Sequence, residues 1–483
     1  MNREIKRVSI VVLCMFLALF VSTSIIQVGV SDSLNADGRN TRTLDDSYQV
    51  QRGSILVAGK PVAESVPSTD AYNYQREYPQ GLLYSAVTGF FPVSGAPTGI
   101  EGAMNGELSG TSSDDFFTQL QNLMTGKHPQ GNSVELTIDP VAQQAAYDAL
   151  GSQQGAVVVI EPKTGRILAM VSKPDFDPNT LAVHDVSKVD AAYQKLLDAS
   201  GSPLINKSIN ELNPPGSTMK PVVTSAAFES GDFTKDSTFP NPASLTLPGT
   251  DTTIHNASFT SCGSGKTASI ETAQVLSCNI PMAELGMKLG SSAIKQQAEA
   301  YGFNHQFSIP MRVSPSVYPG YTDLAPLAMS AFGQADDKAT PLQMAMVSAG
   351  IANGGVVMQP TLVQSVLTPD LQVRESFQAK EFGRAISKKT ADTETQLMTE
   401  GVDSGVASNA RIDGVEVAGK TGTAQHGADD PYTLWFTGFA PANNPQYAIA
   451  VMVDNGGGLG QDGDGNSVAA PIAKKVLEAV LGK

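Results

Sequence analysis

The chain opens with a short basic segment followed by a long apolar one. Arg3, Lys6 and Arg7 precede an uncharged run over residues 8–28. About 20 apolar residues are enough for a helix to cross a bilayer, and the flanking positive charges predict that residues 1–7 lie in the cytoplasm. A cleaved signal peptide is the alternative, but the run is long for one and lacks an A-x-A cleavage site. We therefore predict an uncleaved single-pass anchor in the plasma membrane, with the remainder of the chain extracytoplasmic.

Residues 29–132 carry only short apolar runs without a sustained period. The first part, to about residue 46, is polar and is typical of a tether. Residues 51–61 contain two short strand-like pieces around a glycine-containing turn, and Gly95 and Gly99 interrupt the pattern that follows. We predict an irregular, non-catalytic module that serves as a pedestal or for dimerisation.

A short predicted strand over 134–138 begins a second region near residue 133, and we predict a second domain over 133–483. Residues 140–150 are predicted to form a helix, for which Asp139 is a good N-cap. Apolar runs over 156–160 and 167–171, joined by a Pro-Lys-Thr-Gly turn, predict a β-hairpin.

The later part of this domain returns to strands. Two are predicted over 433–439 and 447–453, and an apolar-faced helix over 469–481 ends the chain. Among the helices between, residues 341–353 follow Thr340 with a capping-box spacing. Strands early and late with helices between them predict an α/β (α+β) domain, in which one antiparallel sheet is flanked by helices and an all-helical lobe is inserted.

Composition narrows the function classes. Lys plus Arg is 32 and Asp plus Glu is 47, which gives a net charge of −15 and argues against nucleic acid as a partner. The five His residues form no H-E-x-x-H, and no paired Cys-x-x-Cys occurs, so we expect neither metal nor cofactor. Residues 462–473 begin like a calcium loop, but Ser467 and Ala473 occupy its sixth and twelfth positions.

The three cysteines fall in two settings. Cys14 lies inside the apolar run, whereas Cys262 and Cys278 would meet an oxidising compartment if exported. A disulfide between these two and a pair of reduced thiols are both compatible with the sequence, which does not reveal the Cα separation that a bridge requires.

The first candidate for chemistry is Ser217. Two prolines and a glycine precede it, so it falls at a predicted helix start, and Lys220 lies on the same face one turn on. A serine hydroxyl needs a neighbouring base, and a lysine can serve where burial and nearby cations lower its pKa. A serine N-cap beside a solvated lysine is the alternative, and S-x-x-K alone is weak.

Two further short motifs carry candidate residues. Ser277 and Asn279 do not share a helix face, so they point into one cleft only from a loop; a polar turn is the alternative.

Lys420 and Gly422 share one face of a predicted strand. The missing side chain at Gly422 would admit a substrate backbone, and Lys420 would attract a carboxylate. An ordinary strand end with a solvated lysine is the alternative here.

The order of the three motifs is more specific than any one of them. S-x-x-K, S-x-N and K-T-G follow one another at spacings of about 60 and about 140 residues, which is the set of penicilloyl-serine transferases. Over nearly the whole chain the sequence resembles class B (monofunctional) penicillin-binding proteins, most closely the actinobacterial penicillin-binding protein A type. The resemblance also includes Arg52-Gly53-Ser54-Ile55, Gly99-Ile100-Glu101 and residues 435–441.

The resemblance implies a peptidoglycan D,D-transpeptidase. Ser217 would attack the penultimate D-Ala carbonyl of a stem peptide that ends in D-Ala-D-Ala. Lys220 would accept its proton, and Ser277 would help return a proton to the leaving D-Ala. Asn279 and Lys420 would position the substrate. An amine of a neighbouring stem peptide would then resolve the acyl-enzyme.

The resemblance also implies binding positions and a partner. Thr421 and Thr423 would bind the terminal carboxylate beside Gly422, and the backbone N–H groups of Ser217 and Thr423 would form the oxyanion hole. β-Lactams would mimic the donor and leave Ser217 acylated. A polytopic glycosyltransferase is implied as a partner, because too little chain lies between the anchor and Arg52 for such a domain.

Three other functions share these motifs. A β-lactamase would need efficient water activation and would lack the anchor and the module over 29–132. A DD-carboxypeptidase differs only in using water instead of an amine, and the Arg52-Gly53 module argues against it by resemblance. A non-catalytic penicillin-binding scaffold or sensor would not need an intact motif set. The acceptor amine, the septal or lateral-wall role and the oligomeric state stay open.

Overall fold

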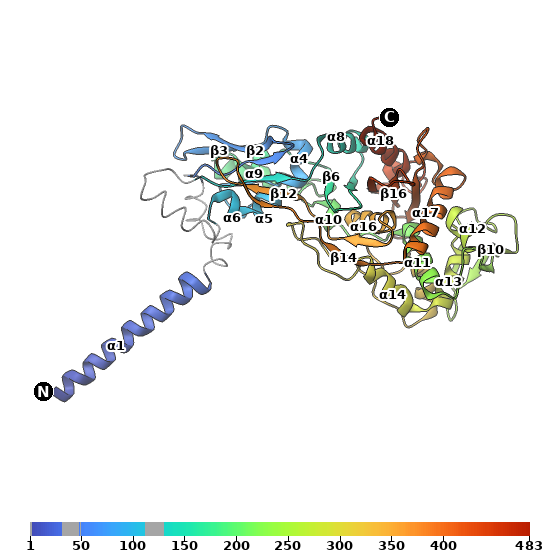
Figure 1. The fold of residues 1–483 in the computed structure, drawn as a ribbon, viewed down its shortest axis with the longest axis horizontal. Coiled ribbons are helices and arrows are strands. Elements are labelled where there is room, and N and C mark those ends of the chain that lie inside the picture. The colour runs from blue at the N-terminus through green and yellow to red at the C-terminus, as the bar shows by residue number, and fades with distance from the viewer. Residues whose placement is uncertain (1, 31–47, 49, 112–129) are drawn as a thin grey trace.

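The computed structural model describes residues 2–30, 48, 50–111 and 130–483 (Figure 1). The predicted tether therefore lies largely outside the described residues. Helix α1 spans Asn2–Ser24 and continues as a π-helical segment, η1 (Ile25–Gly29). Its apolar side chains are exposed, Phe16 by 67% and Phe20 by 72%. Within the described ranges, this is the helix long and apolar enough to cross a membrane, as the sequence predicted.

A six-stranded sheet forms the centre of the N-terminal region, in the order β13-β12-β4-β1-β2-β3. Two of its strands come from far along the chain, so the N-terminal module and the following domain share one sheet (Figure 1). The predicted pair of strands over 51–61 is present as β1 and β2. The strands are β1 (Ile55–Val57), β2 (Lys60–Pro67), β3 (Tyr74–Glu77), β4 (Ser133–Leu136), β12 (Val363–Leu367) and β13 (Val373–Ser376).

Short helices lie beside this sheet and between it and the next domain. Helix α4 contacts strands of both regions, β2 and β6. The helices are α4 (Gly81–Thr88), α5 (Gly99–Ala103), α6 (Asn105–Ser109), η3 (Pro178–Leu181), α9 (Val186–Leu197) and α10 (Lys207–Asn210).

A five-stranded antiparallel sheet with the order β15-β16-β17-β5-β6 forms the second domain. Because side chains alternate along a strand, strands β5, β6, β16 and β17 each contribute to two cores. Val451 lies in the core beneath α8 and α18, and Met452 lies in the core beneath α16. The elements are β5 (Gly155–Ile160), β6 (Ile167–Lys173), β15 (Ala418–Ala424), β16 (Thr433–Ala440), β17 (Tyr447–Val453), α8 (Pro140–Leu150), α16 (Pro341–Ala352) and α18 (Ala469–Leu481).

The predicted local signals operate as expected. The Asp139 carboxylate accepts hydrogen bonds from the first turn of α8, and Thr340 caps α16 through the N–H of Gln343. The predicted hairpin is the antiparallel pair β5–β6. The sequence prediction of an antiparallel sheet flanked by helices is confirmed.

The inserted lobe is mostly helical but not entirely, which corrects the expectation of an all-helical lobe. Two short two-stranded sheets, β7–β10 and β8–β9, lie between its helices. Their strands have only three residues each, too few to show an alternating pattern in the sequence. The lobe contains η4 (Gly216–Met219), α11 (Lys220–Ser230), β7 (Thr238–Pro240), β8 (Ser244–Thr246), β9 (Thr253–His255), β10 (Thr267–Ser269), α12 (Ile270–Val275), α13 (Ile280–Leu289), α14 (Ser291–Ala300) and α15 (Leu324–Ser330).

The remaining elements connect the lobe with the sheet. Helix α17 packs on α11, α12 and β15, so it joins the two parts. These elements are β11 (Val356–Met358), β14 (Glu381–Arg384), α17 (Lys388–Asp403), η5 (Ser408–Ala410) and η6 (Asn455–Gly458).

A buried charge cluster ties the N-terminal module together. Glu101 accepts from Arg52 Nε and Arg76 Nε at 2.6 Å each, and its carboxylate also accepts from Tyr78. All three charged residues are at most 3% exposed. Burial by itself raises the pKa of Glu101, but the two guanidinium groups outweigh it and the pKa lies below its usual value. The motif residues Arg52 and Glu101, noted in the sequence, thus form one ion-paired core.

We predict that Glu101→Gln destabilises the protein by about 3–5 kcal/mol, because it leaves two buried guanidinium groups without a counter-charge. Denaturant unfolding of the full-length protein in detergent measures this change. The control is Asp392→Asn, which breaks an exposed pair with Lys388 and should change stability little. Equal losses in both variants would contradict the prediction.

Candidate active site

Ser217 lies in the 3₁₀ turn η4, directly before helix α11. The turn begins at Gly216, whose φ of +54° is the left-handed conformation that glycine adopts without strain. Ser217 is partly exposed, whereas its neighbours Thr218 and Met219 are buried. The predicted helix start is therefore present, with the serine side chain open to the outside.

Close backbone contacts hold this turn in place. Gly216 N donates to Gly333 O at 3.0 Å, and a Cβ on Gly333 would lie 2.1 Å from Gly216 O. The indole N–H of Trp435 donates to Pro214 O at 3.0 Å. The Ser217 turn is thus held by the loop that follows α15. Strand β16 holds the proline segment that precedes the turn.

Gly422 has a different role from the one expected. Its missing side chain was expected to admit a substrate backbone, but a Cβ there would lie 2.9 Å from Pro215 O and 3.2 Å from Thr218 N. On another side, a Cβ on Gly465 would lie 2.5 Å from Gly422 O. The space beside Gly422 is therefore filled by the Ser217 turn, and the glycine lets strand β15 approach that turn.

Lys220 is fully buried and converges on the second motif. Its Nζ donates to Ser277 O at 2.7 Å, to Asn279 Oδ1 at 3.0 Å and to Ser277 Oγ at 3.2 Å. Burial lowers the pKa of Lys220 well below its usual value, and the charge of Lys420 lowers this pKa further. The lysine is thus suited to hold its amine in the neutral form, which can accept a proton.

Lys420 approaches the same serine from strand β15. Its Nζ donates to Ser277 Oγ at 2.8 Å and to Thr421 O at 3.1 Å. Burial lowers the pKa of Lys420 to about 7. The Ser277 hydroxyl therefore lies between two buried lysines, and the structure brings together side chains from each of the three motifs.

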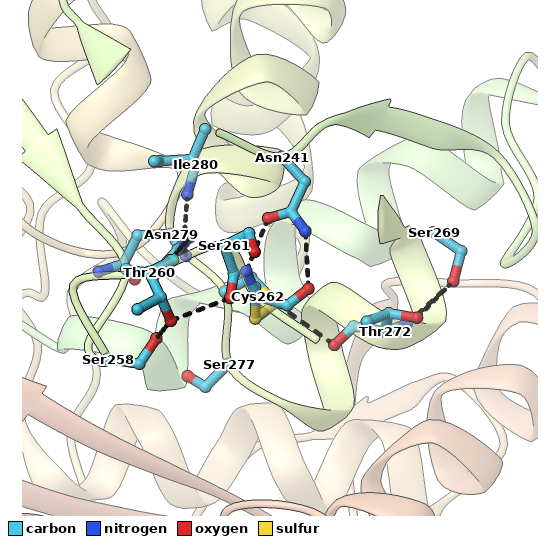
Figure 2. The surroundings of a disulfide bond; sticks show 12 residues. Asn241, Ser258, Thr260, Ser261, Cys262, Ser269, Thr272, Ser277, Asn279 and Ile280 are labelled. Carbon is cyan, nitrogen blue, oxygen red and sulfur yellow. Dashed lines mark hydrogen bonds between the residues drawn. A yellow bond between two sulfur atoms is a disulfide. The ribbon is translucent and has the colours of Figure 1, made fainter. Parts of the chain in front are cut away.

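The Ser277–Asn279 loop joins α12 to α13 and is anchored on both sides. Ser277 has a φ of +56°, and the next residue, Cys278, forms a disulfide with Cys262 across a Cα separation of 5.7 Å (Figure 2). The Asn256 side chain accepts from the backbone N–H of Asn279 at 2.9 Å. Of the two alternatives left open by the sequence, the structure shows the disulfide.

Gly216, which precedes one of the two expected oxyanion donors, lies against Thr423, which is the other. A Cβ on Gly216 would lie 2.9 Å from Thr423 O and 3.3 Å from Thr423 N, so the backbone before Ser217 and that of Thr423 are in contact. Thr423 Oγ1 accepts from Gly465 N at 3.3 Å. Thr421 Oγ1 donates to Val406 O at 3.3 Å, a long hydrogen bond that a charge-assisted one to a carboxylate can replace.

Sequence reasoning assigned no role to several residues that build the site. Asn256 lies 23 positions before Asn279, to which it bonds, and no local pattern marks it. Trp435 belonged only to the family resemblance, and the contacts of Gly333 and Trp435 with the segment around Ser217 connect distant parts of the chain. In the part of the chain that the structure describes, no group of three His, Cys, Asp or Glu side chains is placed to hold a metal ion.

Comparison with known proteins gives matches along the chain. Residues 155–478 match the family described as penicillin binding protein transpeptidase domain, and residues 52–134 match the penicillin binding protein A dimerisation domain. The peptidoglycan D,D-transpeptidase PbpA of Mycolicibacterium smegmatis is 39% identical, over 100% of this chain and 99% of its own length. The protein of the same name from Mycobacterium tuberculosis is 38% identical over the same shares.

Solved structures are similar as well. Penicillin-binding protein A from M. tuberculosis, as a ceftriaxone acyl-enzyme complex, superimposes with a TM-score of 0.87 at 38% identity, covering 90% of this chain and 99% of that one. Its penicillin G acyl-enzyme complex gives a TM-score of 0.84 at 37% identity, covering 89% and 100%. A D,D-transpeptidase domain from Eggerthella lenta gives 0.78 at 31% identity, covering 90% and 99%.

We predict that Gly422→Ala slows acylation of Ser217 by a penicillin about ten- to hundredfold, because the new Cβ pushes β15 and the Ser217 turn apart. The acylation rate constant with a fluorescent penicillin measures this effect. The control is Gly383→Ala in strand β14, where a Cβ would meet nothing within 4 Å. An unchanged rate in Gly422→Ala, with a folded protein by circular dichroism, would contradict the packing role.

Proposed function

The chain belongs to the penicillin-binding proteins with a transpeptidase domain, and we propose that it is a peptidoglycan D,D-transpeptidase whose nucleophile is Ser217. One observation carries the assignment of residues. Lys220 and Lys420 are both buried and both donate to Ser277 Oγ, on the helix and the strand that flank the Ser217 turn. A pair of lysines with lowered pKa values next to an accessible serine is a proton-transfer site for a serine nucleophile.

Acylation uses these residues in turn. Ser217 Oγ forms a bond to the penultimate D-Ala carbonyl carbon while the neutral Lys220 amine takes the hydroxyl proton. The carbon–nitrogen bond to the terminal D-Ala then breaks, and Ser277 passes its hydroxyl proton to the departing nitrogen while it takes up the proton that Lys220 holds. The backbone N–H groups of Ser217 and Thr423 stabilise the negative charge on the carbonyl oxygen during both steps.

Transfer reverses this proton path. The amine of a second stem peptide attacks the acyl-enzyme carbonyl, its proton passes to the same lysine–serine relay, and the hydroxyl of Ser217 is restored.

Other residues position the reacting groups. Thr421 and Thr423 hold the donor carboxylate during acylation, and Asn279 orients Lys220 through its amide oxygen, which accepts from Lys220 Nζ at 3.0 Å. A β-lactam enters as a donor whose leaving nitrogen stays attached, so Ser217 remains acylated.

We also propose the cellular arrangement that the sequence predicted. Helix α1 anchors the chain in the plasma membrane with both folded parts extracytoplasmic, and residues 29–132 form a non-catalytic module ahead of a catalytic domain over 133–483. The chain works beside a polytopic glycosyltransferase. Protease protection of the folded parts in intact cells supports this topology, and failure to recover a glycosyltransferase after gentle crosslinking counts against the partner.

The adduct with a penicillin tests the assigned nucleophile. We predict a stable mass increase equal to one penicillin in wild type and none in Ser217→Ala, because only an intact hydroxyl can form the ester. The control is Ser230→Ala, at the other end of α11, which should acylate normally. Rapid loss of the adduct would indicate a β-lactamase, and no adduct in wild type would indicate a non-catalytic scaffold.

The pH dependence of acylation tests the lysine pair. The positive charge of Lys420 lowers the pKa of Lys220, so Lys420→Met should raise that pKa and leave less neutral amine near pH 7. We predict that the rising limb of the acylation rate moves to higher pH in Lys420→Met. In wild type the rate should rise as Lys220 loses its proton, at a pH well below the usual pKa of a lysine.

A surface substitution provides the comparison for this profile. Lys474→Met on α18, whose partner Glu478 is on the same helix, should leave the profile in place. The idea fails if the Lys420→Met profile keeps the wild-type midpoint and only its height changes.

A further inference from the structure

Phe259 combines two features that are each unfavourable for a phenylalanine. Its side chain is 73% exposed, and its φ of +55° is a left-handed conformation that bulky side chains rarely adopt. The residue closes a turn, with its N–H donating to Asn256 O at 2.9 Å. Glycine or asparagine would fill this backbone position better, so the turn alone does not explain an exposed aromatic ring.

The segment that carries Phe259 is fixed to the active site. The Asn256 side-chain oxygen accepts from the backbone N–H groups of Asn279 and Ile280 at 2.9 and 3.1 Å. Farther along, Cys262 is joined to Cys278, the middle residue of the Ser277–Asn279 loop (Figure 2). The exposed ring is therefore held in a constant position relative to the residues that contact Lys220.

A second ring and the catalytic amide lie beside it. The His255 ring packs on Phe259 with a centroid distance of 5.3 Å and an interplanar angle of 38°. The main-chain oxygen of His255 accepts from Asn279 Nδ2 at 3.0 Å, while Asn279 Oδ1 accepts from Lys220. The two exposed rings form a surface that we call the aromatic rim. The Asn279 side chain links the backbone of this rim to Lys220.

We propose that the aromatic rim binds the apolar part of the donor's acyl chain, on the N-terminal side of the reacting D-alanyl unit, and so sets donor preference. The proposal rests on the function given above. Strand β15 with Thr421 and Thr423 takes the terminal carboxylate on one wall of the site. The chain leaving in the other direction passes the opposite wall, which Asn279 forms and the aromatic rim extends.

Two matched variants separate a binding role from a structural one. Phe259→Asn removes the ring and relieves the left-handed backbone. Leu371→Asn is the matched control, because it also removes an exposed apolar side chain from a left-handed backbone but lies remote from the three motifs. Leu371 is in the β12–β13 turn, has a φ of +62° and is 63% exposed, and its N–H donates to Thr368 O at 2.8 Å. Both variants should keep or raise the melting temperature of the full-length protein in detergent.

Two synthetic donors with the same leaving thiol, N-acetyl- and N-hexanoyl-D-alanyl thioesters, report on the rim. Acylation of Ser217 releases the thiol, and its rate gives the second-order acylation rate constant. We expect Phe259→Asn to lower this constant about three- to tenfold for the hexanoyl donor and to leave it within about twofold for the acetyl donor. Leu371→Asn should match wild type with both.

The possible outcomes separate a failure of the aromatic rim proposal from a failure of the proposed transpeptidase function. A wild type that reacts with neither donor and takes no penicillin adduct overturns both. A reactive wild type overturns the rim alone if Phe259→Asn slows both donors equally, slows neither, or changes only the rate at which an acceptor amine resolves the acyl-enzyme. A lower melting temperature in Phe259→Asn than in Leu371→Asn would also count against the rim, because it indicates that the ring stabilises the loop.

Discussion

Two buried lysines that share one serine hydroxyl are the constraint on which the site depends. Lys220 and Lys420 both donate to Ser277 Oγ, and among the residues that the structure describes the other partners of their amines are carbonyl and amide oxygens rather than carboxylates. Burial without a counter-charge favours the neutral amine, which is the form that can accept a proton from a serine. Water entering between these groups would restore ordinary pKa values, so the reactivity requires a dry and rigid surrounding.

The surrounding is rigid because backbones touch directly. At Gly216, Gly333, Gly422 and Gly465 a single added carbon would fall within 3 Å of a neighbouring backbone, so strand β15, the Ser217 turn and two loops pack without intervening side chains. Because such close contacts hardly compress, a shift of one of these segments moves the others as well. The same contacts explain why the K-T-G motif needs a glycine at its third position, where a Cβ would meet the Ser217 turn.

The Ser277–Asn279 loop shows a second way to gain rigidity. It carries a left-handed serine, and it is tied to the preceding segment by a disulfide and by the Asn256 side chain. The turn in that preceding segment carries Phe259, whose exposed ring lies on a left-handed backbone. The other residues of the segment are held by hydrogen bonds. A strained residue in an otherwise over-determined loop is where a binding role is expected.

The sequence by itself determined the elements and the identity of the chemistry. Capping residues placed α8 and α16, apolar runs placed most strands of the central sheet, and the order of three short motifs indicated the family and its chemistry, because these signals are local or depend only on order along the chain. The tertiary structure alone decided that Lys220 and Lys420 meet at one hydroxyl, that β12 and β13 join the N-terminal sheet, and that Gly422 faces the Ser217 turn. Each of these contacts joins segments far apart in sequence, and their partners are selected by packing, which no local pattern encodes.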